Sequence, residues 1–513
     1  MRNTSNFFMT SIMCVVGLAF APAQQSAGLQ EQVRAYRIAH EKEIVREFSR
    51  LLSLPNRASD SRDIELNAEF IKTMLESRGI TVRMLGVKGA PPVILGELRT
   101  PDARSTIGIY AHYDGQPVDP AQWLSPPFSP VVRDQTGKVI EWEGAANFDP
   151  EWRVYARSAS DDKAPIEATM AALDALRASH TPLSVDVKFI FEGEEEAGSI
   201  HLPQILKEHA DALDAEIWLL CDGPVHQSRR MQVFFGARGE TDLEITTYGP
   251  ARPLHSGHYG NWAPNPIVLL THLIDSMRDT DGNILIQGFY EDVRPLTATE
   301  KQTLARTPAA DAQLKRELAI RVPEGGGAPL AEQILKPALN VRGVQAGHVG
   351  AQAANVISTE AEASIDIRLV PNQTPAQVRA KVEEHIARQG FFIVHDDPDA
   401  STRQAHAHVV KLQWGSGYPP YRASMENVTA QRIIRTIETA TPVVQVVTLG
   451  GSVPMYLFES QKHTPVIGVP IANHDNNQHA ADENLRLQNL WDAIQVFASI
   501  FAEYGADQRP VRP

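Results

Sequence analysis

The run Val185-Asp-Val-Lys-Phe-Ile-Phe191 has the length and composition of a buried β-strand, and it leads directly into Glu192-Gly-Glu-Glu-Glu-Ala-Gly-Ser199. A short apolar run of this kind is typical of a strand that is covered on both faces in a parallel sheet. Three consecutive glutamates repel one another, so they need compensating positive charge if they are held together at the end of a core strand. Taken alone, the triplet also fits a solvated acidic turn, the usual structure of a run of like charge.

Helices and strands alternate on both sides of this run, which predicts an α/β fold with a largely parallel sheet flanked by helices. The pattern predicts helices over 30–54, 62–79, 165–179 and 488–504, and strands over 80–85, 92–98, 106–110, 185–191 and 216–220.

The middle of the chain has a different pattern, which predicts a smaller α+β domain inserted into the first. Long alternating strands are expected over 232–247 and 361–370, with helices over 264–277 and 375–390 and a short strand over 391–394. Between them, 279–350 is rich in Pro, Gly and Ala and predicts long loops with short helices. We therefore expect a first domain made of 24–236 and 425–513, interrupted by an inserted domain over 237–424.

The N-terminus has the order of a secretory signal peptide. Arg2 precedes an apolar segment over 7–20 that ends in Ala21-Pro-Ala23, which predicts residues 1–23 as the signal, with cleavage after Ala23 and a secreted or periplasmic protein. A retained membrane anchor is the alternative, although the apolar stretch is short for a membrane span. Removal of the signal leaves Cys221 as the only cysteine, so no intramolecular disulfide is expected.

The charge of the chain argues against two classes of partner. Its formal net charge is -14, whereas a protein that binds nucleic acid needs a basic face. The sequence also has no block rich in Lys and Arg that would bind an anionic membrane surface.

Acidic residues and histidines follow four of the expected strands, including one over 465–471, and Asp161 lies just ahead of the helix that opens at Pro165. Carboxyl ends of parallel strands meet at one edge of a sheet, so these loops are expected to converge.

Gathered carboxylates and imidazoles must be paired or bind cations. Oxygen and nitrogen ligands suit zinc, with cobalt or manganese as possible replacements. The sequence has no His-Glu-x-x-His helix, so ligands scattered over five loops suit a two-metal centre. The residues in these four loops are His112, Asp114, Glu194, Glu195, Glu196, Asp222, His474 and His479.

Five motifs then carry a resemblance to a known family. They are His112-Tyr-Asp114-Gly-Gln-Pro, Ala159-Ser-Asp-Asp-Lys163, Glu192-Gly-Glu-Glu-Glu-Ala-Gly-Ser199, Leu254-His-Ser-Gly257 and Gly450-Gly-Ser452. In this order they resemble the dinuclear zinc metallopeptidases of the carnosine dipeptidase, aminoacylase and carboxypeptidase G type, and the carnosine-dipeptidase branch most of all. The resemblance covers Gln30–Tyr504. It implies a catalytic domain, an inserted lid and dimerisation domain, and two Zn²⁺ per subunit, with Co²⁺ or Mn²⁺ possible.

The resemblance also implies the metal ligands. His112 and Asp222 would hold one metal, Glu196 and His479 would hold the other, and Asp161 would bridge the two. His474 is a rival to His479, but the segment His479-Ala-Ala-Asp-Glu-Asn-Leu fits the closing motif of the family better.

The resemblance further implies the catalytic and substrate-binding residues. Asp114 would orient His112, and Glu195 would be the general base that moves a proton from a metal-bridging water to the leaving amine. His255, from the lid of a partner subunit, would stabilise the developing oxyanion. The residues that would hold or approach the substrate and its carboxylate are Arg368, Gly451, Ser452 and Asn355. Glu194 matches a position that need not be acidic and is interpreted as a solvated neighbour.

The sequence departs from the family at several places around the site. The glycine-rich segment before the bridging aspartate is Tyr155-Ala-Arg-Ser-Ala, and 135–153 reads as an insertion. Ala164, Asn261 and Asp482 also replace family residues. None of these changes removes an expected ligand or the base, and all of them bear on substrate specificity.

These observations predict an exported, homodimeric two-metal hydrolase that cleaves the amide bond of a dipeptide or short peptide. An N-acyl amino acid deacylase of the same family would use the same chemistry. An alternative of another class is a peptide-binding protein that has lost catalysis. The presence of Glu195 together with every expected ligand argues against this last alternative.

Overall fold

The computed structural model describes residues 21–506. Most of the expected signal peptide, including its apolar segment, therefore lies outside the described residues. Ala21–Ala23 are the first residues of helix α1 (Ala21–Ala39). Within 21–506, none of the helices combines the length and the apolar character that a membrane span requires.

The larger of the two main sheets has eight strands in the order β1-β2-β6-β3-β7-β19-β8-β18. Its centre, from β6 through β3 and β7 to β19, is parallel, and β8 and β18 are also parallel to each other. The strands are β1 (Thr81–Leu85), β2 (Val93–Leu98), β3 (Thr106–His112), β6 (Asp186–Glu192), β7 (Ile217–Leu220), β8 (Met231–Phe234), β18 (Val443–Val446) and β19 (Val466–Gly468). The expected mostly parallel sheet is confirmed.

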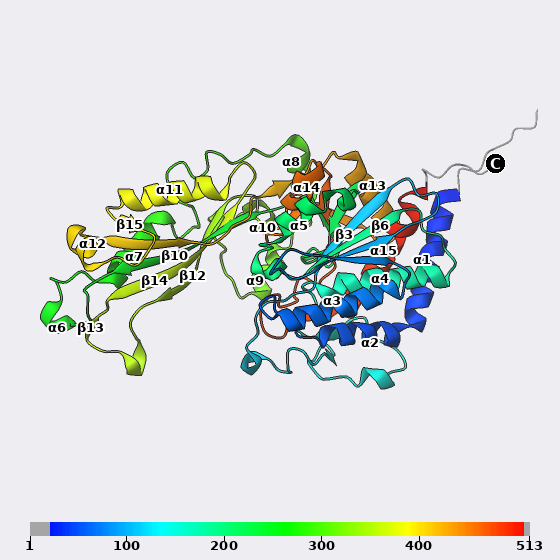
Figure 1. Ribbon diagram of the computed structural model, residues 1–513, viewed down its shortest axis with the longest axis horizontal. Coiled ribbons are helices and arrows are strands. Elements are labelled where there is room, and N and C mark those ends of the chain that lie inside the picture. Colours follow the sequence, from blue (N-terminus) through cyan, green and yellow to red (C-terminus); the bar gives the residue numbers. More distant parts are fainter. Residues whose placement is uncertain (1–20, 507–513) are drawn as a thin grey trace, which may run out of the picture.

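Helices cover both faces of this sheet because side chains alternate along each strand. Ile107 and Ile109 of β3 belong to one core, whereas Tyr110 belongs to the other. The first core is closed by α1, α2 (Glu41–Leu52), α3 (Ser61–Glu76), α4 (Lys163–Ala178), α13 (Val428–Ile437) and α15 (Leu487–Glu503). The second core is closed by α5 (Leu202–Glu208) and α14 (Met455–Lys462) (Figure 1).

A second sheet of five strands, in the order β12-β14-β10-β16-β15, forms the elongated left part of Figure 1. Apolar residues such as Leu243 and Ile365 pack beneath α7 (Pro266–Met277) and α11 (Pro375–Arg388). A capping box between Thr374 and Gln377, followed by Pro375, begins α11. The strands are β10 (Gly239–Tyr248), β12 (Ala338–Gln345), β14 (Glu360–Leu369), β15 (Phe392–Val394) and β16 (Val409–Trp414). We refer to this part as the lid.

Two short strands and a short helix form the end of the lid that is farthest from the large sheet (Figure 1). They are β11 (Leu254–His255), β13 (Val356–Ile357) and α6 (Ser256–Tyr259). The lid also carries α12 (Ala400–Ala405).

Part of the inserted stretch folds back over the large sheet. It contains α8 (Ala298–Arg306), α9 (Asp311–Glu317) and α10 (Leu330–Gln333). Leu304 and Leu335 pack against the core of the large sheet rather than that of the lid. We retain 237–424 as the proposed extent of the inserted domain, with this segment forming a bridge between the two sheets.

Two expected elements are divided in the structure. The expected helix over 30–54 is two helices, α1 and α2, which are separated at His40. The expected strand over 232–247 is β8, β9 (Gly236–Ala237) and β10. The chain breaks there because it runs against the returning strand β17 (Tyr421–Arg422). A Cβ atom on Gly236 would lie 2.3 Å from the carbonyl oxygen of Tyr421, so only glycine fits.

The expected insertion over 135–153 has a structural role. It connects two strands of a three-stranded sheet made of β4 (Val131–Arg133), β5 (Arg153–Tyr155) and β20 (Asn484–Arg486). Within it, the ring of Phe148 lies beside those of Trp142 and Trp152. The remaining elements are short 3₁₀ helices: η1 (Pro120–Gln122), η2 (Trp142–Gly144), η3 (Glu195–Ala197), η4 (Ala210–Leu213), η5 (Gly325–Gly327) and η6 (Gly350–Gln352).

Candidate metal centre

The expected metal ligands converge at one edge of the large sheet. His112 ends β3, Asp222 follows β7, and Glu195 and Glu196 form η3 directly after β6. Two groups of side chains have ligand atoms that all lie within 4.8 Å of one another: His112, Glu195 and Asp222 in one, and His112, Asp161 and Glu196 in the other.

Asp161 lies between two histidines. Its Oδ1 is 2.9 Å from Nε2 of His112, and its Oδ2 is 3.1 Å from Nε2 of His479. The same His479 nitrogen is 3.3 Å from Oε2 of Glu196. One oxygen of Asp161 therefore faces each half of the cluster, which is the arrangement that a bridging carboxylate requires.

Asp114 joins the end of β3 to the glutamate turn. Its two carboxylate oxygens accept hydrogen bonds from the backbone amides of Glu195 and Glu196, each at 3.0 Å. Its Oδ1 also lies 3.3 Å from Nδ1 of His112. A single buried carboxylate thus fixes both a histidine ring and the turn that carries two further acids.

The acids of the cluster repel one another in the absence of cations. Burial, with the neighbouring Asp161 charge, raises the pKa of Asp222 to about 7. Burial also raises the pKa of Glu195 well above its usual value. Burial alone would lower the pKa of His479, but hydrogen bonds to Asp161 and Glu196 raise it to about 10. Without metal, these groups therefore retain protons, and the protons offset part of the negative charge of the cluster. This set of oxygen and nitrogen donors fits two divalent metal ions such as zinc.

Sequence reasoning assigned no role to Glu483, which supports the Asp161 loop. Its carboxylate accepts hydrogen bonds from the backbone amides of Ser158, Ser160 and Asp161 at 2.9–3.0 Å. It also pairs with the Arg157 guanidinium at 2.7 Å. All these donors lie more than 300 positions away in the chain, so no local pattern around Glu483 could reveal them.

Two glutamines that sequence reasoning did not select also contact the cluster. Gln116 donates a hydrogen bond to Oε2 of Glu196 at 2.7 Å. Gln478 donates one to Oδ2 of Asp161 at 2.8 Å. Each glutamine thus provides a hydrogen-bond donor to one of the carboxylates that gather around His479.

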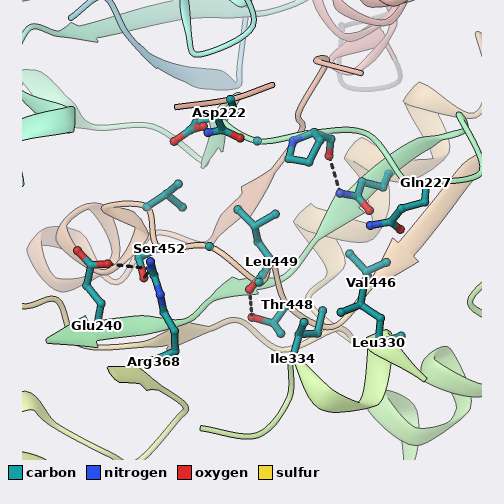
Figure 2. Close-up of a pocket in the computed structure, with 18 of the residues that line it drawn as sticks. Asp222, Gln227, Glu240, Leu330, Ile334, Arg368, Val446, Thr448, Leu449 and Ser452 are labelled. Carbon is teal, nitrogen blue, oxygen red and sulfur yellow. Dashed lines mark hydrogen bonds and ion pairs between the residues drawn. The ribbon is translucent and has the colours of Figure 1, made fainter. Parts of the chain in front are cut away.

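The expected carboxylate-binding residues lie together on the wall of the same cavity, as Figure 2 shows for two of them. Nη1 of Arg368 donates a hydrogen bond to Oγ of Ser452 at 2.8 Å, and Gly451 lines the cavity beside them. The same guanidinium pairs with Glu240 at 2.8 Å and Asp366 at 3.2 Å. A substrate carboxylate would therefore meet Arg368 where acidic side chains already neutralise it.

His255 and Asn355 are not brought to this cluster within the chain. They lie side by side at the far end of the lid, where Asn355 accepts a hydrogen bond from the amide of Ser256 at 2.9 Å. Both residues are exposed, and neither lines the cavity formed by the described residues.

Two alternatives left by the sequence can be compared with the structure. His474, only 9% exposed, faces Glu317 of α9 at 3.9 Å, whereas His479 lies among the carboxylates. The interpretation of Glu194 as a solvated neighbour is wrong. Its side chain is only 13% exposed, and its carboxylate lies 2.8 Å from Nδ1 of His201. The same carboxylate accepts a hydrogen bond from the backbone amide of His201.

The cluster opens into a cavity of about 730 Å³ between the large sheet, the lid sheet and the α8–α10 segment. This volume is within the usual range for a site that encloses a small molecule. Its polar end contains the metal cluster and Arg368, and the rest is lined by side chains from α9, α10 and the loop after β18.

Comparison with known proteins identifies similar chains. The model of Peptidase family M20/M25/M40 matches residues 108–503. Human Beta-Ala-His dipeptidase is 26% identical over 425 residues, which cover 80% of this chain and 77% of that protein. Cys-Gly metallodipeptidase dug1 of Schizosaccharomyces pombe is 25% identical over 479 residues, which cover 90% of this chain and 95% of that protein.

Solved structures share the fold. The dipeptidase Dug1p from Saccharomyces cerevisiae superposes with a TM-score of 0.77 at 20% identity, over 94% of this chain and 99% of that one. The M20 family metallo-carboxypeptidase Sso-CP2 from Sulfolobus solfataricus has a TM-score of 0.74 at 26% identity, over 90% of this chain and 99% of that one. Each superposition covers at least 90% of this chain, so the likeness extends over both the large sheet and the lid.

Proposed function

The chain belongs to peptidase family M20, and from this premise we propose that it is an exported two-metal dipeptidase. Its substrates would be dipeptides or short peptides with a free carboxylate. The observation that carries the proposal is the position of Asp161, which faces His112 with one oxygen and His479 with the other. Similar chains named as dipeptidases support this substrate class.

The two metal ions would be held by residues of the cluster described above. His112 and Asp222 would bind one ion, Glu196 and His479 the other, and Asp161 both. Zn²⁺ is our first choice for this donor set, with Co²⁺ or Mn²⁺ able to replace it. When bound, the ions would supply the positive charge that activates a water molecule and polarises the carbonyl of the amide bond.

Glu195 is the proposed general base. It lies 3.9 Å from His112, lines the cavity, and is held by the Asp114 hydrogen bond to its backbone. Its carboxylate takes a proton from the attacking water and delivers it to the amine nitrogen as the carbon–nitrogen bond breaks. The products are a carboxylate and a free amine.

Substrate orientation is assigned to Arg368, Gly451 and Ser452, which would bind the free carboxylate. A guanidinium suits this role because it has five N–H donors, so Arg368 can bind a substrate carboxylate beside its contacts with Glu240 and Asp366.

We further infer a homodimer formed through the lid. His255 and Asn355 are exposed at the far end of the lid, so they would complete the site of a partner subunit rather than that of their own chain. Exposed apolar side chains near them, Trp262 (80%) and Val349 (89%), support an interface there.

The experiment that tests this function compares Glu195→Gln with Glu194→Gln after loading with Zn²⁺, Co²⁺ or Mn²⁺. We expect Glu195→Gln to lose roughly 10²–10⁴-fold in turnover while it keeps two metal ions per chain. Glu194→Gln is the matched control because Glu194 pairs with His201 instead, and it should retain activity.

The substrates in this experiment are dipeptides, tripeptides and N-acyl amino acids. Unchanged turnover by Glu195→Gln, or protein that binds no metal, would overturn the proposal. Turnover of N-acyl amino acids alone would identify a deacylase instead.

A further inference from the structure

We propose that the apolar end of the cavity is a subsite for a large apolar side chain on the carboxyl-terminal residue of the substrate. This inference rests on the proposed peptidase function and specifies its substrate class. The subsite, which we call the apolar wall, consists of Leu330, Ile334, Val446 and Leu449.

The apolar wall combines two parts of the chain that are far apart in sequence. Leu330 and Ile334 come from α10 and the residue after it, and Val446 and Leu449 come from the end of β18 and the following loop. Figure 2 shows Leu330, Ile334 and Val446 in the part of the pocket that is away from Asp222, with Leu449 nearer to Asp222. Leu330 is 42% exposed although it is a large apolar residue. A bound apolar side chain would cover such surface favourably.

The apolar wall adjoins the proposed carboxylate anchor. A Cβ atom on Gly450 would lie 3.4 Å from Cγ2 of Ile334, so the two segments are in contact there. Gly450 is followed by Gly451 and Ser452, and its carbonyl accepts a hydrogen bond from Arg238 at 2.7 Å. The free carboxylate and the side chain of a terminal residue share one Cα atom. A residue anchored at Ser452 and Arg368 therefore brings its side chain toward Ile334 and Leu449.

The apolar wall also lies on the side of the scissile bond that this assignment requires. Leu449 is within 3.3 Å of the position that a Cβ atom on Gly223 would occupy, and Gly223 follows the metal ligand Asp222. Leu449 thus lies close to the metal cluster (Figure 2), and it is joined to the carboxylate anchor through Gly450 and Gly451. The substrate residue that spans the interval between the cluster and the anchor is the carboxyl-terminal one.

Charged groups beside the apolar wall are already engaged. Asp311 accepts a hydrogen bond from the amide of Leu330 at 2.8 Å, and Asp242 pairs with Arg342 at 3.1 Å. An anionic substrate side chain would lose its hydration here without an unpaired cation among these groups, because Arg342 already pairs with Asp242. An apolar side chain carries no such cost.

The α8–α10 segment places this wall. Leu335 is buried in the core of the large sheet, and this fixes the position of the neighbouring Ile334. The bridge between the sheets therefore determines which side chains the cavity accepts.

The test measures kcat/KM of the zinc-loaded protein for Gly-Leu, Leu-Gly, Gly-Gly and Gly-Asp. We expect Gly-Leu to exceed both Gly-Gly and Gly-Asp by about tenfold or more, because even one methylene group in an apolar pocket changes selectivity by about this factor. Leu-Gly should not show this advantage. If Leu-Gly is preferred instead, the assignment to the carboxyl-terminal residue is overturned.

Two variants of the wall, Ile334→Asp and Leu330→Asp, should each lower the ratio of Gly-Leu to Gly-Gly by about tenfold. Ile334→Lys should raise the ratio of Gly-Asp to Gly-Leu. The matched control is Leu318→Asp, because Leu318 follows α9 in the same segment, is 62% exposed and does not line the cavity. It should keep the wild-type ratio.

The outcomes separate the two proposals. If the wild type hydrolyses neither these dipeptides nor the other dipeptides and tripeptides of the functional test, the proposed function fails. Suppose that the wild type hydrolyses them with equal kcat/KM for Gly-Leu and Gly-Gly, or that the ratio of these two values is unchanged in both Ile334→Asp and Leu330→Asp. In either case the apolar subsite is wrong and the proposed function stands. Since Leu330 is partly exposed, its variant tests the subsite even if the Ile334 variants fold poorly.

Discussion

At the scale of single residues, two buried carboxylates outside the proposed ligand set position the carboxylates within it. Asp114 fixes the backbone of the glutamate turn, and Glu483 fixes the backbone of the loop that presents Asp161. Each accepts hydrogen bonds from several amides at once, which keeps the ligand side chains aimed at a common point. Partners of this kind typically contribute 10–100-fold to metal affinity or activity.

Replacement of Glu483 by Gln should therefore weaken metal binding by about 10–100-fold. The amide has only one acceptor oxygen, so it cannot serve Ser158, Ser160 and Asp161 together, and it leaves the buried Arg157 without its counter-charge. The measurement is a competition titration of zinc against a chelator.

Asp482→Asn is the matched control for this prediction. Asp482 is the preceding residue and accepts a hydrogen bond from the amide of Leu124, which an asparagine oxygen can also accept. Zinc affinity should be unchanged in this variant. Equal affinities in Glu483→Gln and the wild type would show that the Asp161 loop holds its position without Glu483.

At the scale of elements, the sequence predicted site loops most accurately where a clear strand pattern is followed directly by acidic residues or histidines. The strand over 106–110 is β3, and the strand over 185–191 is β6, so the loops carrying His112 and Glu195 could be expected to meet. The sequence predicts short helices within 279–350, and α8, α9 and α10 are such helices. The surface on which they pack could not be predicted, because Leu304 and Leu335 pack against a sheet formed elsewhere in the chain. The division between β8 and β10 depends on contact with the distant strand β17.

The strand-end loops also make the stability of the metal-free protein depend on pH. The pKa of Asp222 is about 7 in the folded protein, above its usual value of 3.8, because of burial and the Asp161 charge. The pKa of His479 is about 10, above its usual 6.5, because hydrogen bonds to Asp161 and Glu196 outweigh its burial. Both groups bind more protons when folded than when unfolded. The free energy of unfolding therefore falls as pH rises from about 4 through 7 toward 10.

We expect the urea midpoint of chelator-treated protein to be lower at pH 8.5 than at pH 5.5. Zinc should raise the midpoint most at pH 8.5, where the ions replace the lost protons and bind only the folded chain. Asp222→Asn should flatten the pH dependence, since it removes one of the titrating groups. A metal-free midpoint that rises between these pH values would contradict the linkage.

At the scale of the whole molecule, the cavity is enclosed by both sheets and by the bridge of α8–α10, but one expected catalytic residue is absent from it. His255 lies at the end of the lid opposite to the large sheet, as the position of α6 in Figure 1 indicates. Its ring accepts a hydrogen bond from the amide of Gly257 and lies beside His258. Local contacts thus hold it in an exposed position, which is what a residue that serves another subunit requires.

Co-expression of His255→Ala and Glu195→Gln chains should test this division of the site. Each variant alone should form an inactive homodimer, because one lacks the oxyanion donor and the other lacks the base. In a mixed dimer, the Glu195 of one chain meets the His255 of the other at one of the two sites. Random pairing makes half of the dimers mixed, so the preparation should recover about a quarter of the wild-type rate per chain. Recovery should fall when one variant also carries Trp262→Asp, if the lid interface includes that exposed side chain. If His255 served its own chain, the mixture would remain as inactive as its components, because no single chain in it carries both residues.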